Sequence, residues 1–311
     1  MHTGWNWITL NVNPVDNNWS LNTILSSIAN SGQRIVGQKG YAEFDDAWYG
    51  TLNTLLPVAM YMLKIKTETC LSIEGIQISP HDMTIQLNQG WNWIGYIPES
   101  PLLLQKALES IGNNGLRIIG QKGYAEYDNG WWGSLTTLEP SAGYMLKMIQ
   151  SDELLYPIGT KRSKKIVQKD DILPETIQHW QFDYANFEFQ GTITATIDKR
   201  PEQNDIMAAF INNQCSGIAK PVETPRGYRF FLQVWSNDRE GEIAIKYYDA
   251  SLKSILQVRF DEILSFSVNM ENGSIQEPVM FSPIRLKGDI DRNGKVNMED
   301  VLHIFEQLSF E

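Results

Sequence analysis

The feature that most constrains this chain is an internal repeat that fills its first half. The segment GQKGYAEFDDAWYG, from Gly37 to Gly50, returns as GQKGYAEYDNGWWG from Gly120 to Gly133. Residues 25–65 align with 108–148 without a gap, and roughly 26 of the 41 aligned positions are identical, far more than chance allows. A shorter motif, GWNW, opens both copies, at Gly4 and at Gly90. The first half is therefore one structural unit written twice.

Each copy predicts the same order of elements. A strand (5–12 and 91–97) precedes a short amphipathic helix (21–28 and 103–111), whose apolar residues recur at i, i+3, i+4 and i+7. Three short strands follow, at 34–37, 41–44 and 61–65 in the first copy and at 117–120, 124–127 and 144–148 in the second. One further strand, 83–87, precedes only the second GWNW. We interpret this difference as a sign that the sequence is an excerpt from a longer protein.

The second half of the chain has a different pattern. Lysine and arginine gather between residues 160 and 171, and we interpret 161–175 as a solvated basic linker. Period-two alternation then predicts seven strands, at 179–189, 192–197, 206–211, 228–235, 242–248, 255–260 and 264–268. This pattern favours an antiparallel β-sandwich over residues 176–284.

The fold class predicted from these patterns is mostly β, with α+β repeats. It comprises two small tandem modules (1–76 and 77–160), the β-sandwich, and a C-terminal EF-type calcium loop with its helix (285–311).

Composition excludes several classes of protein. The net charge of −11 over 311 residues argues against a nucleic-acid or anionic-membrane partner. Only Cys70 and Cys215 are present, so a disulfide framework is excluded even in an exported protein. No apolar run is long enough to insert in a membrane.

The end of the chain carries the most specific motif, GDIDRNGKVNMED. Calcium takes six to eight oxygen ligands, and a twelve-residue EF-type loop supplies them from positions 1, 3, 5, 7, 9 and 12 around a glycine at position 6. Counting from the first aspartate fills every position, and the glycine is Gly294. The predicted Ca²⁺ ligands are Asp289, Asp291, Asn293, the carbonyl of Lys295, Asn297 and Asp300. The alternative is an ordinary solvated Asp/Asn turn.

Three resemblances accompany these motifs. The aspartate at position 12 and the GDxDxNGKVN opening resemble a type I dockerin calcium segment, which implies calcium binding and a cohesin-like partner, although dockerins pair two segments and this chain has one. GWNW with a later GYMLK resembles tandem "GWN" modules of bacterial surface proteins. The stretch DIMAAF, followed by CSGIA, resembles an immunoglobulin-like module of secreted bacterial proteins. Together they imply an extracellular or cell-surface location.

Aromatic residues supply the candidate binding sites of the repeats. Sugar rings stack on flat indoles, and nearby polar side chains accept hydroxyl hydrogen bonds. The candidates are Trp48, Tyr49 and Asp45 in the first copy, and Trp131, Trp132, Asp128 and Asn129 in the second. The alternative is that the aromatic residues fill small cores. Adjacent residues of an extended segment point to opposite faces, so we expect one member of each aromatic pair to be exposed.

No catalytic motif is present: the sequence has no GxSxG, no HExxH, no phosphate loop and no dinucleotide fingerprint. Two functions therefore stay open. The first is non-catalytic binding of a polysaccharide or cell-surface glycan, or adhesion, through the repeats. The second is a structural spacer or scaffold segment of a larger surface, filament or dockerin–cohesin assembly.

Overall fold

The computed structural model describes residues 1–157, 173–260 and 262–284, with the positions 288, 289, 296, 298, 300–302 and 305 toward the C-terminus. The chain forms two compact units. One contains Met1–Gln168 with Asp183–Glu188, and the other contains Lys169–Phe182 with Phe189–Glu311. Strands dominate the described part of both units, so the prediction of a mostly β fold is confirmed.

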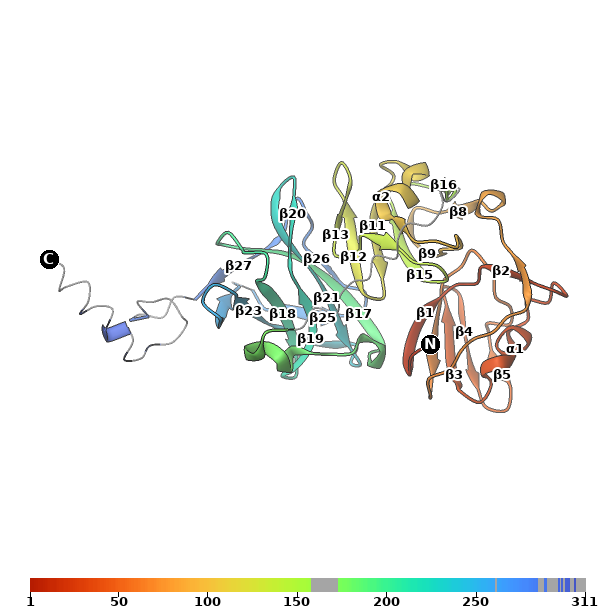
Figure 1. Ribbon diagram of the computed structural model, residues 1–311, viewed down its shortest axis with the longest axis horizontal. Coiled ribbons are helices and arrows are strands. Elements are labelled where there is room, and N and C mark those ends of the chain that lie inside the picture. Colours follow the sequence, from red (N-terminus) through yellow and green to blue (C-terminus); the bar gives the residue numbers. More distant parts are fainter. Residues whose placement is uncertain are drawn as a thin grey trace. The chain divides into compact units, whose positions relative to one another are not determined.

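The first unit contains two five-stranded antiparallel sheets with the same strand order (Figure 1). One sheet has the order β1 (Gly4–Ile8), β6 (Tyr61–Ile65), β3 (Gly32–Gly37), β4 (Gly40–Phe44) and β5 (Trp48–Gly50). The other has the order β9 (Gly90–Gly95), β15 (Gly143–Met148), β11 (Gly115–Gly120), β12 (Gly123–Tyr127) and β13 (Trp131–Gly133). Each GWNW motif therefore forms an edge strand of its own sheet.

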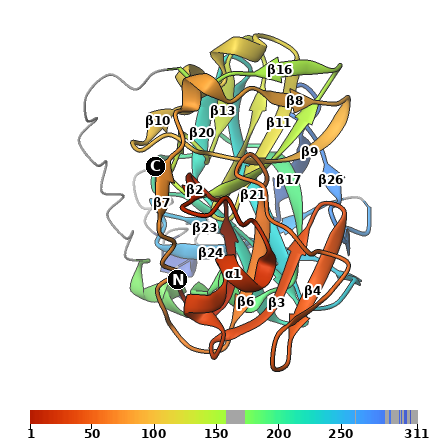
Figure 2. The ribbon, with the colours of Figure 1, turned by 90° about the vertical axis from the view of Figure 1, so that its right-hand side faces the viewer.

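The helices of the repeats are shorter than predicted. The first copy has α1 (Leu21–Ile24) followed by the 3-10 turn η1 (Ser26–Ile28), and the second has α2 (Leu104–Ala107) followed by η3 (Glu109–Ile111). Leu25 leaves the helical conformation at φ −95°, ψ 11° and is fully buried. Burial of this side chain thus accompanies the end of the α-helix after one turn. Figure 2 shows α1 beside β3 and β6, whose apolar side chains share its core.

Three two-stranded ladders complete the first unit. They pair β2 (Val12–Pro14) with β7 (Gly75–Gln77), β8 (Ile85–Leu87) with β16 (Asp152–Leu154), and β10 (Leu102–Leu103) with β14 (Thr137–Leu138). The 3-10 turns η2 (Pro80–Asp82) and η5 (Tyr184–Asn186) also belong to this unit.

The second unit is built around a nine-stranded sheet with a shared core. The strand order is β19 (Gln214–Ala219), β18 (Ile206–Ile211), β23 (Ala244–Asp249), β24 (Ser254–Arg259), β27 (Val279–Pro283), β17 (Phe189–Ile197), β21 (Gly227–Ser236) and β20 (Pro221–Thr224), with β26 (Glu271–Asn272) beside β17. A separate ladder joins β22 (Glu240–Glu242) to β25 (Ser265–Ser267). Apolar side chains of β17 and β21 pack against those of β18 and β23 in one hydrophobic core. A second buried cluster joins Ile177 and Trp180 to Phe210 of β18.

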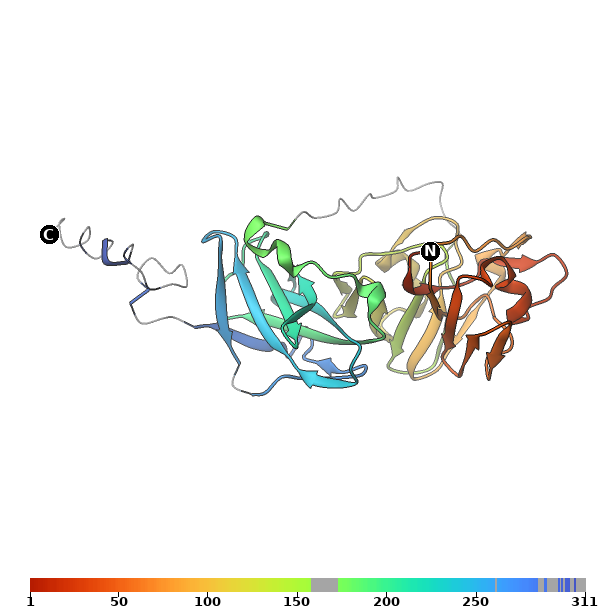
Figure 3. The same ribbon diagram turned by 90° about the horizontal axis from the view of Figure 1, so that it is seen from below.

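Two features of residues 173–284 differ from the prediction. β17 pairs in parallel with β26 and β27, so the sheet is not purely antiparallel. The strand predicted at 179–189 is wrong: the chain instead forms the 3-10 turns η4 (Glu175–Trp180), which Figure 3 shows in green, and η5. The side chain of Asp183 accepts a hydrogen bond from the Ala185 amide at 3.0 Å. This local bond closes a turn in place of an extended ladder.

Most of the predicted basic linker lies outside the described residues. No described helix is long and apolar enough to cross a membrane.

Candidate functional site

The predicted aromatic residues divide into an inward and an outward set. Trp48 in β5 and Trp131 in β13 belong to the cores of their repeats. Each indole lies over a glycine: a methyl group at Gly32 would be 2.5 Å from the Trp48 ring, and one at Gly115 would be 2.6 Å from the Trp131 ring. These two rings are core residues and offer no open face to a ligand.

The outward residues are Tyr49 and Trp132. Tyr49 is 59% exposed, and its hydroxyl donates a hydrogen bond of 2.8 Å to Asp46. This hydrogen bond, together with the negative charge of Asp46, raises the pKa of Tyr49. Trp132 is half-buried, and its indole N–H donates to the carbonyl oxygen of Asp128 at 3.2 Å. Each aromatic pair thus has one inward and one outward member.

The polar neighbours of these aromatic residues form hairpin turns. The Asp45 amide donates to the Ala47 carbonyl at 3.1 Å, and the Asp128 amide donates to the Gly130 carbonyl at 2.8 Å. Asn129 has a positive φ of 54°, a conformation that asparagine tolerates in tight turns. Asp45 and Asn129 are exposed, whereas Asp128 is buried.

The asparagine side chain of each GWNW motif forms hydrogen bonds with the backbone at the start of its own strand. Asn6 is buried and donates to the carbonyls of His2 and Gly4 at 2.7 and 3.0 Å. Asn92 repeats this pattern with the carbonyls of Asn88 and Gly90, at 2.8 and 3.0 Å. The Oδ1 atoms of the two asparagines accept from the amides of His2 and Asn88, at 3.0 and 2.9 Å. Since both ends of each side-chain amide already bind backbone groups, these side chains are not open to sugar hydroxyls.

The tryptophans of GWNW are less exposed in the first copy than in the second. Trp5 and Trp7 are buried, whereas Trp91 and Trp93 are half-buried.

The repeated GQKG motif reaches across to the GWNW strand of the other repeat. Gln38 donates to the Trp91 carbonyl at 2.8 Å and accepts from the Trp93 amide at 3.0 Å. Gln121 donates to the Trp5 carbonyl at 2.6 Å and accepts from the Trp7 amide at 3.0 Å. The two contacts are reciprocal, which gives the pair of repeats an approximate two-fold relationship. We name these four hydrogen bonds the glutamine clasp.

Further backbone contacts follow the same two-fold relationship. Ile8 forms a β-bridge with Ala142, and Ala59 forms the matching bridge with Ile94. The Thr9 amide donates to the Ser141 carbonyl, and the Gly95 amide donates to the Val58 carbonyl, both at 2.9 Å. The two repeats therefore meet through main-chain hydrogen bonds as well as through the clasp.

Sequence analysis did not predict the glutamine clasp. The only signal was that Gln38 and Gln121 are identical in both copies.

Most of the predicted calcium loop falls outside the described residues. Asp291, Asn293, Lys295 and Asn297 belong to that part, so their geometry is not described. The two ends of the loop are described: Asp289 is half-buried, and Asp300 is 1% exposed. The described residues contain no cluster of three or more His, Cys, Asp or Glu side chains that could hold a metal.

A buried carboxylate in the second unit was also not predicted. Asp205 is fully buried and accepts hydrogen bonds from the amides of Glu202 and Ala250, both at 2.8 Å, and from the Tyr247 hydroxyl. Burial, followed by this hydrogen bond to Asp205, raises the pKa of Tyr247. The Lys199 ammonium also lies 3.8 Å from this carboxylate. Because two of its donors are backbone amides of separate turns, Asp205 fixes two turns of the fold.

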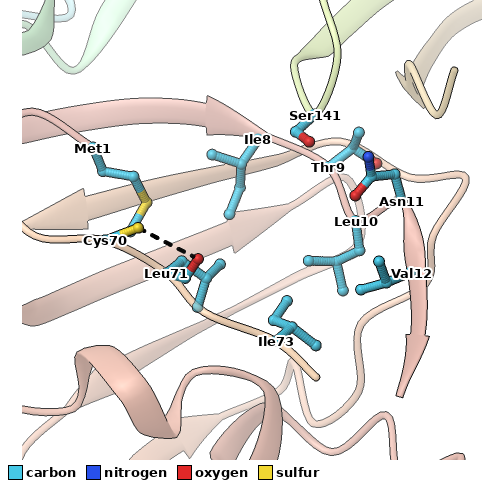
Figure 4. A pocket seen from close by; sticks show the side chains of 10 residues that line it. All are labelled: Met1, Ile8, Thr9, Leu10, Asn11, Val12, Cys70, Leu71, Ile73 and Ser141. Carbon is cyan, nitrogen blue, oxygen red and sulfur yellow. Dashed lines mark hydrogen bonds between the residues drawn. The ribbon is translucent and has the colours of Figure 1, made fainter. Parts of the chain in front are cut away.

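The first unit contains an open cavity of about 310 Å³ beside the N-terminus (Figure 4). Its lining is mainly apolar and includes Met1, Leu10, Cys70, Leu71 and Ile73. None of the predicted binding residues lies in this lining.

Comparisons of the chain with protein-family models, with curated proteins and with solved structures gave no significant match.

Proposed function

We propose that this protein is a non-catalytic structural module, a spacer within a larger bacterial extracellular or cell-surface assembly. The glutamine clasp is the observation that carries the proposal. Both repeated motifs, GWNW and GQKG, contribute to it, and each copy holds the other. Residues identical in both copies thus serve the joint between the repeats.

The burial of the aromatic residues supports the same proposal. Trp48 and Trp131 fill cores, and Trp5 and Trp7 are buried. A binding platform for sugars needs exposed and flat aromatic faces, but four of the eight aromatic residues in the paired motifs are buried. A spacer, in contrast, needs a joint that keeps its modules in one orientation.

Distance measurement between the repeats tests the spacer role. Asn53 and Thr136 occupy equivalent exposed positions in the two repeats. Spin labels at Asn53→Cys and Thr136→Cys, in a Cys70→Ser background, should give one narrow distance distribution. The same labels in a Gln38→Ala/Gln121→Ala variant should give a broader one. A broad distribution in the protein with an intact clasp would contradict a rigid joint.

Carbohydrate binding is the second candidate, and the exposure of Tyr49 favours it. Its ring is 59% exposed beside Asp45 and Asp46, the arrangement of an aromatic platform with carboxylate acceptors. Retention on insoluble polysaccharides or a glycan array, lost in Tyr49→Ala or Trp132→Ala but kept in Tyr41→Ala, would establish this function. Tyr41 is a suitable control because it is 47% exposed on a neighbouring strand. The spacer proposal expects no retention.

We also propose that the C-terminal loop binds one Ca²⁺ ion. The donor set of carboxylates, amide oxygens and one carbonyl suits a hard cation. The burial of Asp300 is consistent with a carboxylate that faces a ligand and not bulk water. When bound, calcium would offset two of the three negative charges that the loop aspartates place within twelve residues. A cohesin-like or other surface protein is the partner that the dockerin resemblance implies.

A further inference from the structure

A second cavity of the first unit is polar and lies on the sheet of the first repeat. Its volume is about 360 Å³, and its lining residues are Gln33, Arg34, Glu43, Phe44, Lys64 and Lys66. Three of these six side chains are cationic and one is anionic, in a chain whose net charge is −11. The cavity is therefore a positively charged site on an acidic protein, and such a site attracts an anion.

Strand pairing places the charged side chains of this cavity side by side. Arg34 of β3 lies opposite Glu43 of β4 on one side and opposite Lys64 of β6 on the other. Opposed side chains of an antiparallel sheet project from the same face. Lys64 is held over the ring of Trp5, with 5.4 Å between its ammonium and the ring centroid. The sheet thus holds two cations and a carboxylate in one row.

The arginine–glutamate pair is closed in the second repeat and open in the first. Arg117 donates to Glu126 at 2.7 Å, and both side chains are buried. In the first repeat, the Nε atom of Arg34 lies 3.6 Å from Glu43, which is too far for a hydrogen bond. This Nε atom is buried and has no hydrogen-bond partner among the described residues. A buried donor without an acceptor is costly, so a bound acceptor would stabilise it.

Two polar residues of the cavity are replaced by apolar residues in the second repeat. Gln33 aligns with Leu116, and Lys66 aligns with Ile149. Equivalent backbone hydrogen bonds hold Lys66 and Ile149, and all four side chains are exposed. The fold therefore accepts apolar residues at these two positions, and the polar residues of the first repeat are not needed to build it.

We propose that this cavity binds one carboxylate-bearing sugar, a uronic acid residue of a short acidic saccharide. Arg34 and the ammonium groups of Lys64 and Lys66 would bind the carboxylate through charge-assisted hydrogen bonds. Gln33 and Glu43 would bind the sugar hydroxyls. A volume of about 360 Å³ lies at the lower end of the range for small-molecule sites.

The charge balance of the site indicates a singly charged ligand. Arg34 also donates to Glu188 at 3.3 Å. The three cations therefore face two carboxylates, those of Glu43 and Glu188, and one formal positive charge is left for the ligand. A carboxylate matches this charge, whereas the acidic chain repels a polyanion such as a nucleic acid. Phe44 adds an apolar contact of the kind that a sugar ring uses.

This site goes beyond the spacer role and differs from the carbohydrate candidate at Tyr49 and Trp132. Neither of these aromatic residues lines the cavity. Retention on an acidic polysaccharide through this site would persist in Tyr49→Ala and would require the carboxylates of the polymer. Failure of the site would leave the distance measurement between the repeats unaffected, so the two proposals fail separately.

NMR titration of the full chain with digalacturonate tests the site, and the methyl ester of the same disaccharide is the control ligand. The ester keeps the rings and hydroxyls but has no charge. We expect it to bind at least about fivefold more weakly, the effect of losing one partly exposed ion pair. Added salt should weaken binding of the acid and leave the ester unaffected.

A variant that copies the second repeat tests the residues. Gln33→Leu/Lys66→Ile places there the side chains that the second repeat carries, so it should fold, and it should bind digalacturonate about fivefold to tenfold more weakly. Lys39→Ile removes an equal charge from an exposed position outside the cavity and should leave the affinity unchanged. Arg34→Lys keeps the charge but loses the planar fork, so it should also bind more weakly.

Three results would overturn the proposal: no binding of digalacturonate, equal binding of its methyl ester, or unchanged affinity in Gln33→Leu/Lys66→Ile. Two further ligands test the chemical class. Equal binding of galactose 6-sulfate would overturn the assignment to a carboxylate, because a sulfate ester carries the same charge. Equal binding of an amidated N-acetylglutamate would overturn the assignment to a sugar, because it supplies a carboxylate without a ring.

Discussion

The side chain of Gln121 accepts a hydrogen bond of 3.0 Å from the backbone amide of Trp7, which lies 114 positions earlier in the chain. The same glutamine donates to the Trp5 carbonyl, so it completes both backbone groups on the free edge of β1. An unpaired strand edge can form backbone hydrogen bonds with a strand of another chain, which leads to aggregation. The clasp covers this edge in each repeat with a residue from the other repeat.

Loss of the clasp should destabilise the first unit, and more so at Gln121 than at Gln38. Gln121 is half-buried, whereas Gln38 is exposed and water can replace it. We expect Gln121→Ala to cost about 1–3 kcal/mol of unfolding free energy, since it leaves two backbone groups unsatisfied. Urea unfolding is the measurement. Gln33→Ala, at an exposed position of β3, is the matched control, and an equal cost there would contradict the role of the clasp.

The contact between Gly115 and Trp131 should not tolerate a methyl group. Gly115→Ala would place its Cβ 2.6 Å from the indole, and we expect a cost of about 1–3 kcal/mol from overpacking. A second change, Trp131→Leu, removes the clash, so the double variant should cost less than the sum of the two single variants. Thermal unfolding of all four proteins measures this coupling. Strict additivity would mean that the two residues do not pack together.

Trp131→Ala should be much more destabilising than Trp132→Ala. The first side chain is 7% exposed and belongs to the core, so its removal should cost about 3–5 kcal/mol. The second is half-buried and donates one hydrogen bond. Denaturant midpoints compare them directly, and similar values would place both rings in equivalent surroundings.

The second unit should lose stability in acid through Asp249. Burial would raise the pKa of this carboxyl, but hydrogen bonds from Lys199, Ser251 and the Leu252 amide outweigh it and hold the pKa below the usual value. Because the folded pKa is the lower one, the stabilisation is present above about pH 4 and is lost as the pH falls through the folded pKa. Urea midpoints measured from pH 7 to pH 3 should show this loss.

Two variants test the cause of that acid sensitivity. Lys199→Met removes the cation that pairs with Asp249, so the folded pKa should move toward the unfolded value and less stability should be lost between pH 7 and pH 3. Asp249→Asn should weaken the pH dependence in this range, since it removes the titrating group. An unchanged profile in both variants would assign the acid transition to other carboxyls.

Calcium titration by calorimetry should detect one site per chain, with weak affinity near the upper end of the 10⁻⁹ to 10⁻³ M range of dissociation constants. Asp289→Ala removes the ligand at the first position of the loop and should abolish the heat of binding. Magnesium should substitute poorly, because it requires a tight octahedral shell and holds its waters. No heat from the unaltered protein at millimolar calcium would show that the loop is an ordinary turn.

Much of the first unit could be predicted from the sequence. The repeat alignment and period-two alternation placed strands β3, β4 and β6, and their counterparts β11, β12 and β15, because alternation is a local property of a half-buried strand. The inward and outward division of Trp131 and Trp132 followed from the same rule. The strand predicted at 179–189 was wrong because the Asp183 side chain closes a turn, a local alternative that alternation does not reveal.

The joint between the repeats was decided only by tertiary structure. Gln38 and Gln121 are polar residues beside a hairpin, and local pattern assigns such residues to solvent. Gln38 binds Trp91, which lies 53 positions away, and Gln121 binds Trp7, which lies 114 positions away. Only the two-fold packing of two complete sheets brings these residues together. The sequence determined which segments of the two repeats are alike. The tertiary structure determined which residues of the two repeats contact each other, because contacts between distant strands are a property of the assembled sheets.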